Sequence, residues 1–518
     1  MSQQRAGSEG PVSRPGVDLA ETVRKVGEKQ GWDAATAYIG QHWDAHATSA
    51  PRRLLDAIEA LPGSVLLNDA SLVIAASYLQ HVVLGEDPTN FDPFQVVPAG
   101  AGPANGALTQ QLTIYTGISA NARTSGDVQK ALDAAEQGRR LLEQIRKGAD
   151  DPARATELDR VQASLPHFFL QWGRSREAAE AGGAGYEYEE AHRIGVRTNQ
   201  PQVARVAAGH LAWRYAERGR VKHAEEWLGR AQATGTPDPR YEAALHLADA
   251  LIELERGDRQ AAGVSLARMR AYPAGEHWAS ALWVRALHAA STEDATLVQN
   301  EFVDELDRHP QSARGPVDAR YLRATRLTLG IAPANDGPRV RTAPDLLLDA
   351  VDAFSRGDLE LAADLVQEPA AATDGAIPRV RANALVVSAA VQLGLGRENA
   401  AVNAFERAHT LLTAEGMTTP YRALPQEMVP FFTDATGRPV AVERGVEPAP
   451  VPITLGTLTP RERELLVFLT TRAKFAEIGA EIHLSPNSVR TAAQRLYRKL
   501  GVNSRKQAAE IAHRAGVA

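Results

Sequence analysis

The chain has 518 residues, of which 44% are hydrophobic and 6% aromatic, and it contains no cysteine. The absence of cysteine excludes disulfide bonds, thiolate metal sites and cysteine nucleophiles. At roughly 150 residues per domain the length predicts about three domains, and the abundance of alanine with few β-branched runs predicts an all-α fold.

The net charge of −6 is unevenly distributed along the chain. From Thr454 onward there are 11 of the 57 Lys and Arg residues and 5 of the 63 Asp and Glu residues, a net charge of +6. The preceding residues keep 46 basic and 58 acidic side chains, a net charge of −12. A basic module on an acidic body is typical of a DNA-binding domain attached to a separate sensory or scaffold region.

The first part of the chain shows no membrane or secretion pattern. Residues 1–17 are polar and rich in glycine and proline, which predicts disorder and no signal peptide. Residues 64–84 are the most apolar long stretch, but Asn68, Asp69 and Ser71 are among the polar residues that interrupt it too often for a membrane span. We therefore expect a cytoplasmic protein that does not contact a membrane.

Two helices are expected between residues 17 and 60, around Trp32–Trp43 and at Pro51–Ala60. His42 and His46 lie four residues apart, as zinc ligands on one helix face do, but no HExxH motif or further ligand cluster accompanies them. Surface or groove histidines are therefore the favoured interpretation, and no metal or cofactor is expected.

Residues 85–107 hold proline and glycine at a density that excludes a regular helix. A loop of this length is either a mobile spacer, the interpretation that we favour, or a lid over a concave face.

From Ala107 onward, pairs of amphipathic helices are predicted to meet at short turns that contain glycine. The interval is 38 residues from Gly219 to Gly257 and 39 residues from Gly357 to Gly396. An alanine-rich helix follows the turn, and its small residues let paired helices pack closely, so that each pair buries its apolar stripe against its neighbours. The predicted turns are Ser125-Gly126-Asp127, Trp172-Gly173-Arg174, Arg218-Gly219-Arg220, Arg256-Gly257-Asp258, Arg356-Gly357-Asp358 and Leu395-Gly396-Arg397.

This rhythm resembles a tetratricopeptide-type helical solenoid, which we place at residues 18–432. A non-repetitive helical bundle is the alternative. Aromatic residues cluster in this body, and we predict that they pack in the core, although a ligand pocket between helix pairs is a second interpretation. The clustered residues are Phe168, Phe169, Trp172, Trp213, Tyr215, Trp227, Trp278 and Trp283.

Residues 433–457 are rich in proline, valine and glutamate and are predicted to form a linker. Four short helices are predicted in the segment 458–518. The first begins at Pro460, since Thr459 and Glu462 form a capping box, and it buries Leu465, Leu466 and Leu469. The second spans Lys474–Ile482 and is expected to bury Ala476, Ile478 and Ile482. The last is capped by Ser504 with Gln507 and closes at Gly516.

The third helix, Pro486–Leu500, is capped by Ser485 and has two distinct faces. Val489, Ala493, Leu496 and Leu500 recur at helical spacing and are predicted to face the other helices. The opposite face carries Asn487, Arg490, Thr491, Gln494 and Arg498. In a major groove, Arg suits guanine, and Asn or Gln suits adenine. Arg495 and Lys499 flank this face and are expected to bind phosphates. Two helices joined by a short turn, the second basic and capped, predict a helix-turn-helix.

The segment resembles the LuxR-type helix-turn-helix of bacterial transcription regulators. The matching blocks are Leu458 to Glu464, Glu477-Ile478, Leu484-Ser485, Ser488 to Thr491, Lys499 to Val502 and Ser504-Arg505. The resemblance implies base contacts from the third helix and dimer contacts through the last helix. The predicted DNA-binding residues are Ser485, Asn487, Ser488, Arg490, Thr491, Gln494, Arg495, Arg498 and Lys499. Arg472, the run Lys474-Phe475-Ala476, and Ala492 depart from the family pattern.

With this C-terminal segment, the body resembles the large MalT-like members of the LuxR superfamily. Those proteins carry an ATPase module, but this chain has no Gly-Lys pair and therefore no phosphate-binding P-loop. The alternation of strands and helices that a receiver domain requires is also missing.

The sequence thus predicts a transcription regulator whose solenoid senses a protein or small-molecule signal and whose last domain binds double-stranded DNA at a two-fold site as a homodimer. The alternative is a protein-interaction scaffold whose helix-turn-helix no longer binds DNA. An enzyme is not expected, because no triad, carboxylate pair or metal-ligand spacing is evident.

Overall fold

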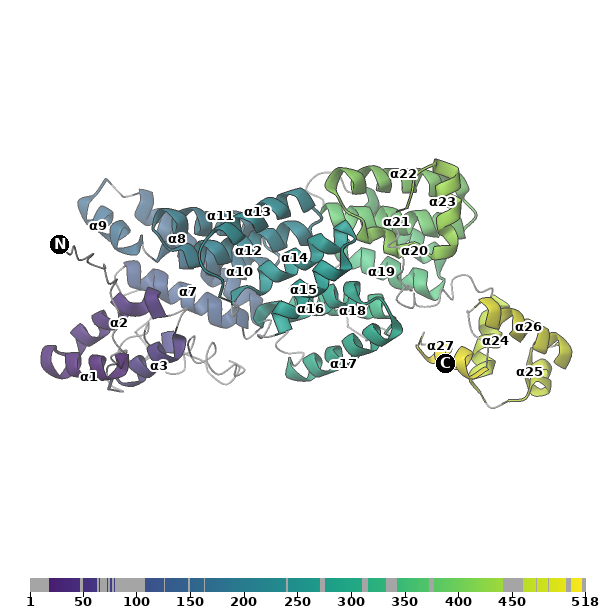
Figure 1. The fold of residues 1–518 in the computed structure, drawn as a ribbon, viewed down its shortest axis with the longest axis horizontal. Coiled ribbons are helices and arrows are strands. Elements are labelled where there is room, and N and C mark those ends of the chain that lie inside the picture. The colour runs from purple at the N-terminus through teal and green to yellow at the C-terminus, as the bar shows by residue number, and fades with distance from the viewer. Residues whose placement is uncertain are drawn as a thin grey trace, which may run out of the picture. The chain divides into compact units, whose positions relative to one another are not determined.

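The computed structural model is all-α in the residues that it describes, as predicted (Figure 1). The chain forms two compact units, Met1–Ala184 and Gly185–Ala518. The described residues are 18–46, 50–62, 65, 72, 75–76, 79, 108–124, 126–147, 150–162, 164–238, 241–270, 275–309, 315–331, 342–371, 377–440, 460–471, 473–482, 484–499 and 505–514.

The first unit begins with helices α1 (Leu19–Gln30), α2 (Trp32–His46) and α3 (Pro51–Glu59). Helices α2 and α3 confirm the two that are predicted here, with α2 continuing three residues beyond Trp43, whereas α1 is a third helix that is not predicted. Apolar residues from all three helices form one core, because each helix turns one stripe inward. Its buried residues include Val23, Ile39, Leu54, Leu55 and Ile58.

A second group in this unit comprises α7 (Leu108–Thr124), α8 (Val128–Lys147), α9 (Pro152–Val161) and α10 (Leu165–Ala178). Helix α8 approaches the Trp172 ring so closely that a Cβ at Gly138 would lie 2.8 Å from Cζ2. The indole Nε1 donates a hydrogen bond to Thr116 Oγ1 at 3.0 Å, so the buried ring keeps its polar atom satisfied.

The predicted turn at Trp172-Gly173-Arg174 is wrong, because these residues lie inside α10. Phe169, Trp172 and Ser175 are all fully buried at helical spacing, and this packing carries the helix past the glycine. The chain instead turns after Ala178, where Gly183 has a φ of +92°.

The second unit is a longer series of helices. Consecutive helices contact one another: α12 packs on α13 and α14, α14 on α15 and α16, α16 on α17 and α18, α18 on α19, α19 on α20 and α21, and α21 on α22. The elements are α11 (Ala184–Arg197), α12 (Pro201–Glu217), α13 (Val221–Ala233), α14 (Ala243–Arg256), α15 (Arg259–Arg270), η4 (Gly275–His277), α16 (Trp278–His288), α17 (Thr292–Arg308), α18 (Pro316–Leu329), α19 (Ala343–Arg356), α20 (Leu359–Ala371), α21 (Pro378–Gly394), α22 (Glu398–Glu415), η6 (Thr419–Ala423), η7 (Gln426–Met428) and α23 (Val429–Thr436).

The other predicted glycine turns, at Gly126, Gly219, Gly257, Gly357 and Gly396, are confirmed. Each glycine is left-handed, with φ between +74° and +82°, and joins two helices of a pair. In each turn the residue after the glycine donates its N–H to the carbonyl five positions earlier, at 2.8 to 2.9 Å. This hydrogen bond satisfies a carbonyl at the helix end, so the sequence encodes the pairing of helices locally.

Helix α23 ends at Thr436, where Gly437 takes a left-handed φ of +65°. The helix therefore extends into the segment predicted as linker. Residues 441–459, the segment 1–17 and the segment 85–107 lie outside the described residues. Within the described part, no helix combines the length and apolar character required to cross a bilayer.

Core packing accounts for most of the clustered aromatic residues. Phe169 and Trp172 meet edge to face at 5.5 Å, and both are fully buried. Trp213 is also buried and contacts the half-buried Trp283 and Tyr321. These rings hold helices together, as predicted.

Candidate nucleic-acid interface

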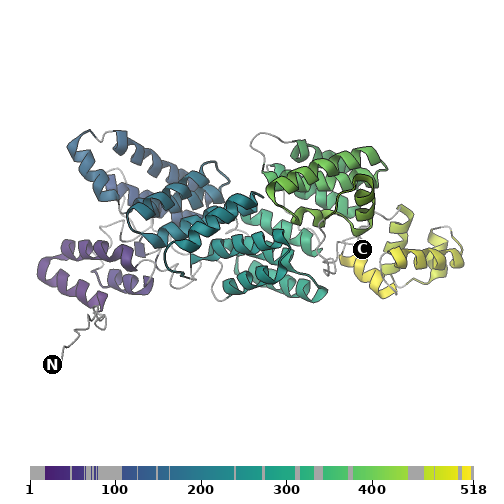
Figure 2. The same cartoon turned by 45° about the horizontal axis from the view of Figure 1, so that its top comes forward.

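The C-terminal segment folds into α24 (Pro460–Thr470), α25 (Phe475–Glu481), α26 (Pro486–Lys499) and α27 (Arg505–Arg514), drawn in yellow in Figure 2. The four predicted helices are confirmed within one to two residues at the described ends. They share one apolar core, in which every helix contributes at least one residue. Its buried members are Leu465, Leu466, Leu469, Ile478, Val489, Ala493, Leu496, Ala508 and Ala512.

The turn between α25 and α26 is tight because Gly479 allows it. A Cβ at Gly479 would overlap the carbonyl oxygen of Leu484 and would lie 3.4 Å from Val489 Cγ2. The Gly479 carbonyl accepts the Leu484 N–H at 2.8 Å. The glycine therefore sets how closely the second and third helices of the domain approach.

Side-chain caps begin both helices of this motif. Glu477 accepts the Lys474 N–H at 2.7 Å and so caps α25. Ser485 Oγ accepts the Ser488 N–H at 3.1 Å and starts α26, and the two hydroxyl oxygens lie 2.8 Å apart. Both serines are exposed, so their hydroxyls lie at the solvent-facing N-terminus of α26.

Arg505 fixes the last helix to the first. Its guanidinium donates to the carbonyl oxygens of Leu469 at 3.0 Å and Thr471 at 2.8 Å, at the C-terminal end of α24. These carbonyls have no partner within the helix, and a cation at this end also complements the helix dipole. The same guanidinium lies 5.9 Å from the centre of the Phe475 ring.

The two faces of α26 separate as the sequence predicts. Val489, Ala493 and Leu496 are buried in the core. Arg490, Thr491 and Gln494 are exposed on the other side of the helix. A helix of 14 residues is about 21 Å long, enough to follow a major groove about 12 Å wide. The helix thus presents a guanidinium, a hydroxyl and an amide together to solvent.

Several predicted residues cannot be placed. The side chains of Asn487, Arg495, Arg498 and Lys499 lie outside the described set, as do Arg472, Leu500 and Ser504. The burial predicted for Ala476 is wrong, because this residue is exposed. The first turn of α25 instead turns Phe475 toward the core, and Ile478 is the fully buried residue of that helix. Of the departures from the family pattern, Phe475 and Ala492 both pack against the core, so they serve the fold.

Gly479 and Arg505 are the residues whose roles sequence reasoning missed. A glycine inside a helical pattern can mark close backbone approach, but only the structure shows the Leu484 carbonyl against it. Arg505 lies in the first turn of α27, where the helix dipole disfavours a cation. This unfavourable position is the sequence signal that its guanidinium binds the end of another helix.

The described exposed charges of this domain are of both signs. Burial raises the pKa of the half-buried Tyr497, so its hydroxyl stays neutral at physiological pH.

Among the described residues of the chain, no group of three His, Asp or Glu side chains is placed to hold a metal ion. His42 and His46 stack at 6.2 Å, and burial together with His42 lowers the pKa of His46.

Comparison with protein families gives one match for this region. Residues 456–512 match the family model GerE, described as bacterial regulatory proteins of the luxR family. The C-terminal domain is a LuxR-type helix-turn-helix. Its family supports a role for the chain as a DNA-binding transcription regulator. No curated protein matches the chain.

Proposed function

We propose that the chain regulates transcription by placing α26 of its LuxR-type domain in the major groove of DNA. The observation that supports this proposal most strongly is the exposed trio Arg490, Thr491 and Gln494, opposite the buried stripe of the same helix. The arginine fork suits guanine O6 and N7, and the glutamine amide suits adenine N6 and N7. Thr491 can bond to either kind of base or contact a thymine methyl group.

The remaining predicted DNA contacts are divided between phosphates and bases. Ser485 and Ser488 stand at the N-terminus of α26, where backbone N–H groups and the helix dipole favour an anion. The spacing of the sequence predicts that Asn487 and Arg498 face the bases and that Arg495 and Lys499 bind phosphates. The domain layout that we propose keeps the predicted body, linker and DNA-binding domain (458–518), with the boundary between body and linker moved from residue 432 to the end of α23 at Thr436.

We further propose that the protein acts as a homodimer on a two-fold site, with contacts through α27. A LuxR-type domain has one recognition helix, and two of them reach half-sites one helical turn apart when a two-fold axis relates them.

The body, a tetratricopeptide-like array in this proposal, receives the signal. An open hollow of about 420 Å³ lies between α11 and α13 and is lined by His192, Val196, Trp227 and Arg230, among others. The Arg230 guanidinium covers the Trp227 ring at 4.3 Å. Because this lining is open and mixes charged with apolar groups, it suits contact with a protein better than enclosure of a small molecule.

The test is DNA binding by the full chain carrying Arg490→Ala. After bound sites have been mapped across a genome, the affinity for one site and for its single-base variants is measured. Loss of a bidentate contact should weaken specific binding by about 1–3 kcal/mol, roughly 5- to 150-fold, and relax discrimination at one base position.

Arg461→Ala is the matched control, because it removes the same charge from an exposed position on α24. If both variants weaken binding equally at every sequence, Arg490 is not a base-reading residue. If the wild-type chain binds no DNA site, the scaffold alternative replaces the regulator proposal.

A further inference from the structure

Hydrogen bonds and ion pairs join two groups of helices in the second unit. The first group is α12–α18 and the second, which we term the C-terminal block, is α19–α23. Where the chain passes from one to the other, Arg320 pairs with Asp345 at 3.4 Å and Arg323 pairs with Asp349 at 2.5 Å. These pairs form one side of the boundary, between α18 and α19.

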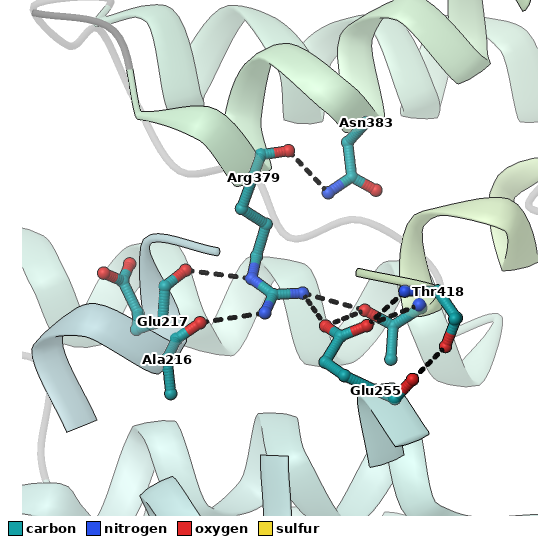
Figure 3. Close-up of polar contacts among 7 residues, drawn as sticks. Ala216, Glu217, Glu255, Arg379, Asn383 and Thr418 are labelled. Carbon is teal, nitrogen blue, oxygen red and sulfur yellow. Dashed lines mark hydrogen bonds and ion pairs between the residues drawn. The ribbon is translucent and has the colours of Figure 1, made fainter. Parts of the chain in front are cut away.

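The other side of the boundary is centred on Arg379, at the start of α21 (Figure 3). Its Nε donates to the Glu217 carbonyl at 2.9 Å and its Nη2 to the Ala216 carbonyl at 2.8 Å, both at the end of α12. Its Nη1 donates to Glu255 Oε1 at 2.5 Å, at the end of α14. The side chains of Arg379 and Glu255 are only 7% and 1% exposed, so the ion pair is withdrawn from water.

The Glu255 carboxylate is satisfied entirely by donors of the C-terminal block. The backbone N–H groups of Thr418 and Thr419 donate to Oε2 at 2.6 and 2.8 Å. Thr419 Oγ1 donates to Oε1 at 2.6 Å, and Thr418 Oγ1 donates to the Glu255 carbonyl at 2.8 Å. These partners are 163 and 164 residues from Glu255 in the chain.

Two further contacts complete this site, which we term the latch. The Arg379 N–H donates to the Arg218 carbonyl at 3.0 Å. Gly219 lies directly under the Met417 sulfur, and a Cβ there would also approach the Arg379 nitrogen to 2.9 Å. The α12–α13 turn therefore fits closely against the block because position 219 carries no side chain.

This arrangement differs from a simple repeat array, in which each helix pair contacts only its neighbours. Through the latch, the block contacts α12 and α14, which precede it in the chain by more than 100 residues. A buried ion pair is costly to desolvate, and breaking it by removing one partner is strongly unfavourable. Water can replace hydrogen bonds when a polar contact separates, whereas separating an apolar core exposes surface that water does not compensate. The boundary is joined by these polar contacts together with the packing of Met417 on Gly219.

We propose that the C-terminal block is latched onto α12 and α14 by Arg379 and Glu255. The latch opens without unfolding either group of helices. Because the chain continues from α23 toward α24, the latch sets the position from which that connection leaves the body.

Amide hydrogen exchange of the full chain, measured without DNA, tests the latch independently of the regulator proposal. The amides of Arg379, Thr418 and Thr419 bond across the boundary, whereas those of Leu251 and Leu385 lie in the cores of α14 and α21. We expect the latch amides to exchange at least about tenfold faster than the core amides, through local opening. Equal rates in both sets would overturn the proposal, since the latch would then open only when the unit unfolds.

Glu255→Gln keeps the shape of the side chain and removes its charge. This variant should speed exchange of the latch amides by about tenfold or more and leave the core amides unchanged. Glu253→Gln is the control, because Glu253 is on the same helix and pairs with Arg256 at the surface, away from the boundary. If the two variants have the same effect, the latch role of Glu255 is wrong.

An engineered disulfide across the boundary should hold the latch closed, which is the opposite of what Glu255→Gln should do. A Cβ built at Gly416 would lie 3.8 Å from Val221 Cβ, the separation found in disulfide bonds, and the chain has no other cysteine. In Val221→Cys with Gly416→Cys, oxidation should form the bond and slow latch exchange about tenfold or more, and reduction should restore it. The single variants control for the left-handed φ of +79° at position 416. Failure to form the bond, or unchanged exchange after it forms, would contradict the proposal.

Discussion

Gly479→Ala should loosen the helix-turn-helix at the joint between its two central helices. The added Cβ would overlap the Leu484 carbonyl oxygen, which is backbone and cannot move away as a flexible side chain could. Overpacking costs about 1–3 kcal/mol, and a backbone clash belongs at the upper end. Alanine returns about 1 kcal/mol through helix propensity, which leaves a net loss of about 2 kcal/mol, roughly 30-fold in the opening equilibrium.

The assay is amide hydrogen exchange at Leu484, whose N–H bonds to the Gly479 carbonyl across the turn, and at Val489, whose N–H bonds to the Ser485 carbonyl at the start of α26. Gly229→Ala is the matched control, since this helical glycine on α13 is exposed and has open space where its Cβ would lie. The control should stabilise its own helix by about 0.5–1 kcal/mol. Unchanged or slower exchange in Gly479→Ala would refute the close-approach argument.

Two further predictions concern phosphate binding and pH. Lys499→Ala should weaken binding to all DNA sequences and reduce the slope of log affinity against log salt by about 0.9, which a salt titration measures; an unchanged slope contradicts the phosphate role. Burial lowers the pKa of His288 below its ordinary 6.5. Below pH 6.5 the unfolded chain takes up a proton that the folded chain resists, so the free energy of unfolding falls as pH decreases toward the folded pKa. His288→Gln should flatten that part of the stability profile in chemical denaturation, and an equally steep profile would contradict it.

The C-terminal domain was largely predictable because its information is local. Caps, apolar spacing and helix length all lie within runs of about 15 residues, and they set both the helices and the faces of α26. Ala476 was misjudged because periodicity in a helix of seven residues fits more than one face. Phe475 takes the inward position there, since its larger side chain buries more apolar surface.

The body was predictable in its turns and not in its tertiary contacts. Left-handed glycines are a local requirement, so five of the proposed turns could be found from composition and spacing. Gly173 fits the same pattern but lies in a helix, because burial of Phe169 and Trp172 outweighs the weak helix propensity of glycine. Arg379 and Glu255 are 124 residues apart, and nothing local to either residue identifies the other as its partner.

Gly219 is subject to both a local requirement, its left-handed backbone, and a long-range one, its packing against the C-terminal block. Gly219 and Gly396 have similar left-handed φ values, +81° and +74°, so alanine costs about 1–2 kcal/mol of backbone strain at either position. Only at Gly219 does the new Cβ also meet Met417 and the Arg379 backbone, whereas Gly396 faces open space. Gly219→Ala should therefore be more destabilising than Gly396→Ala by about 1–3 kcal/mol in chemical denaturation, and it alone should speed exchange at Thr418 and Thr419. Equal losses in the free energy of unfolding in the two variants would mean that Gly219 matters only for the local geometry of its turn and that the block does not pack against it.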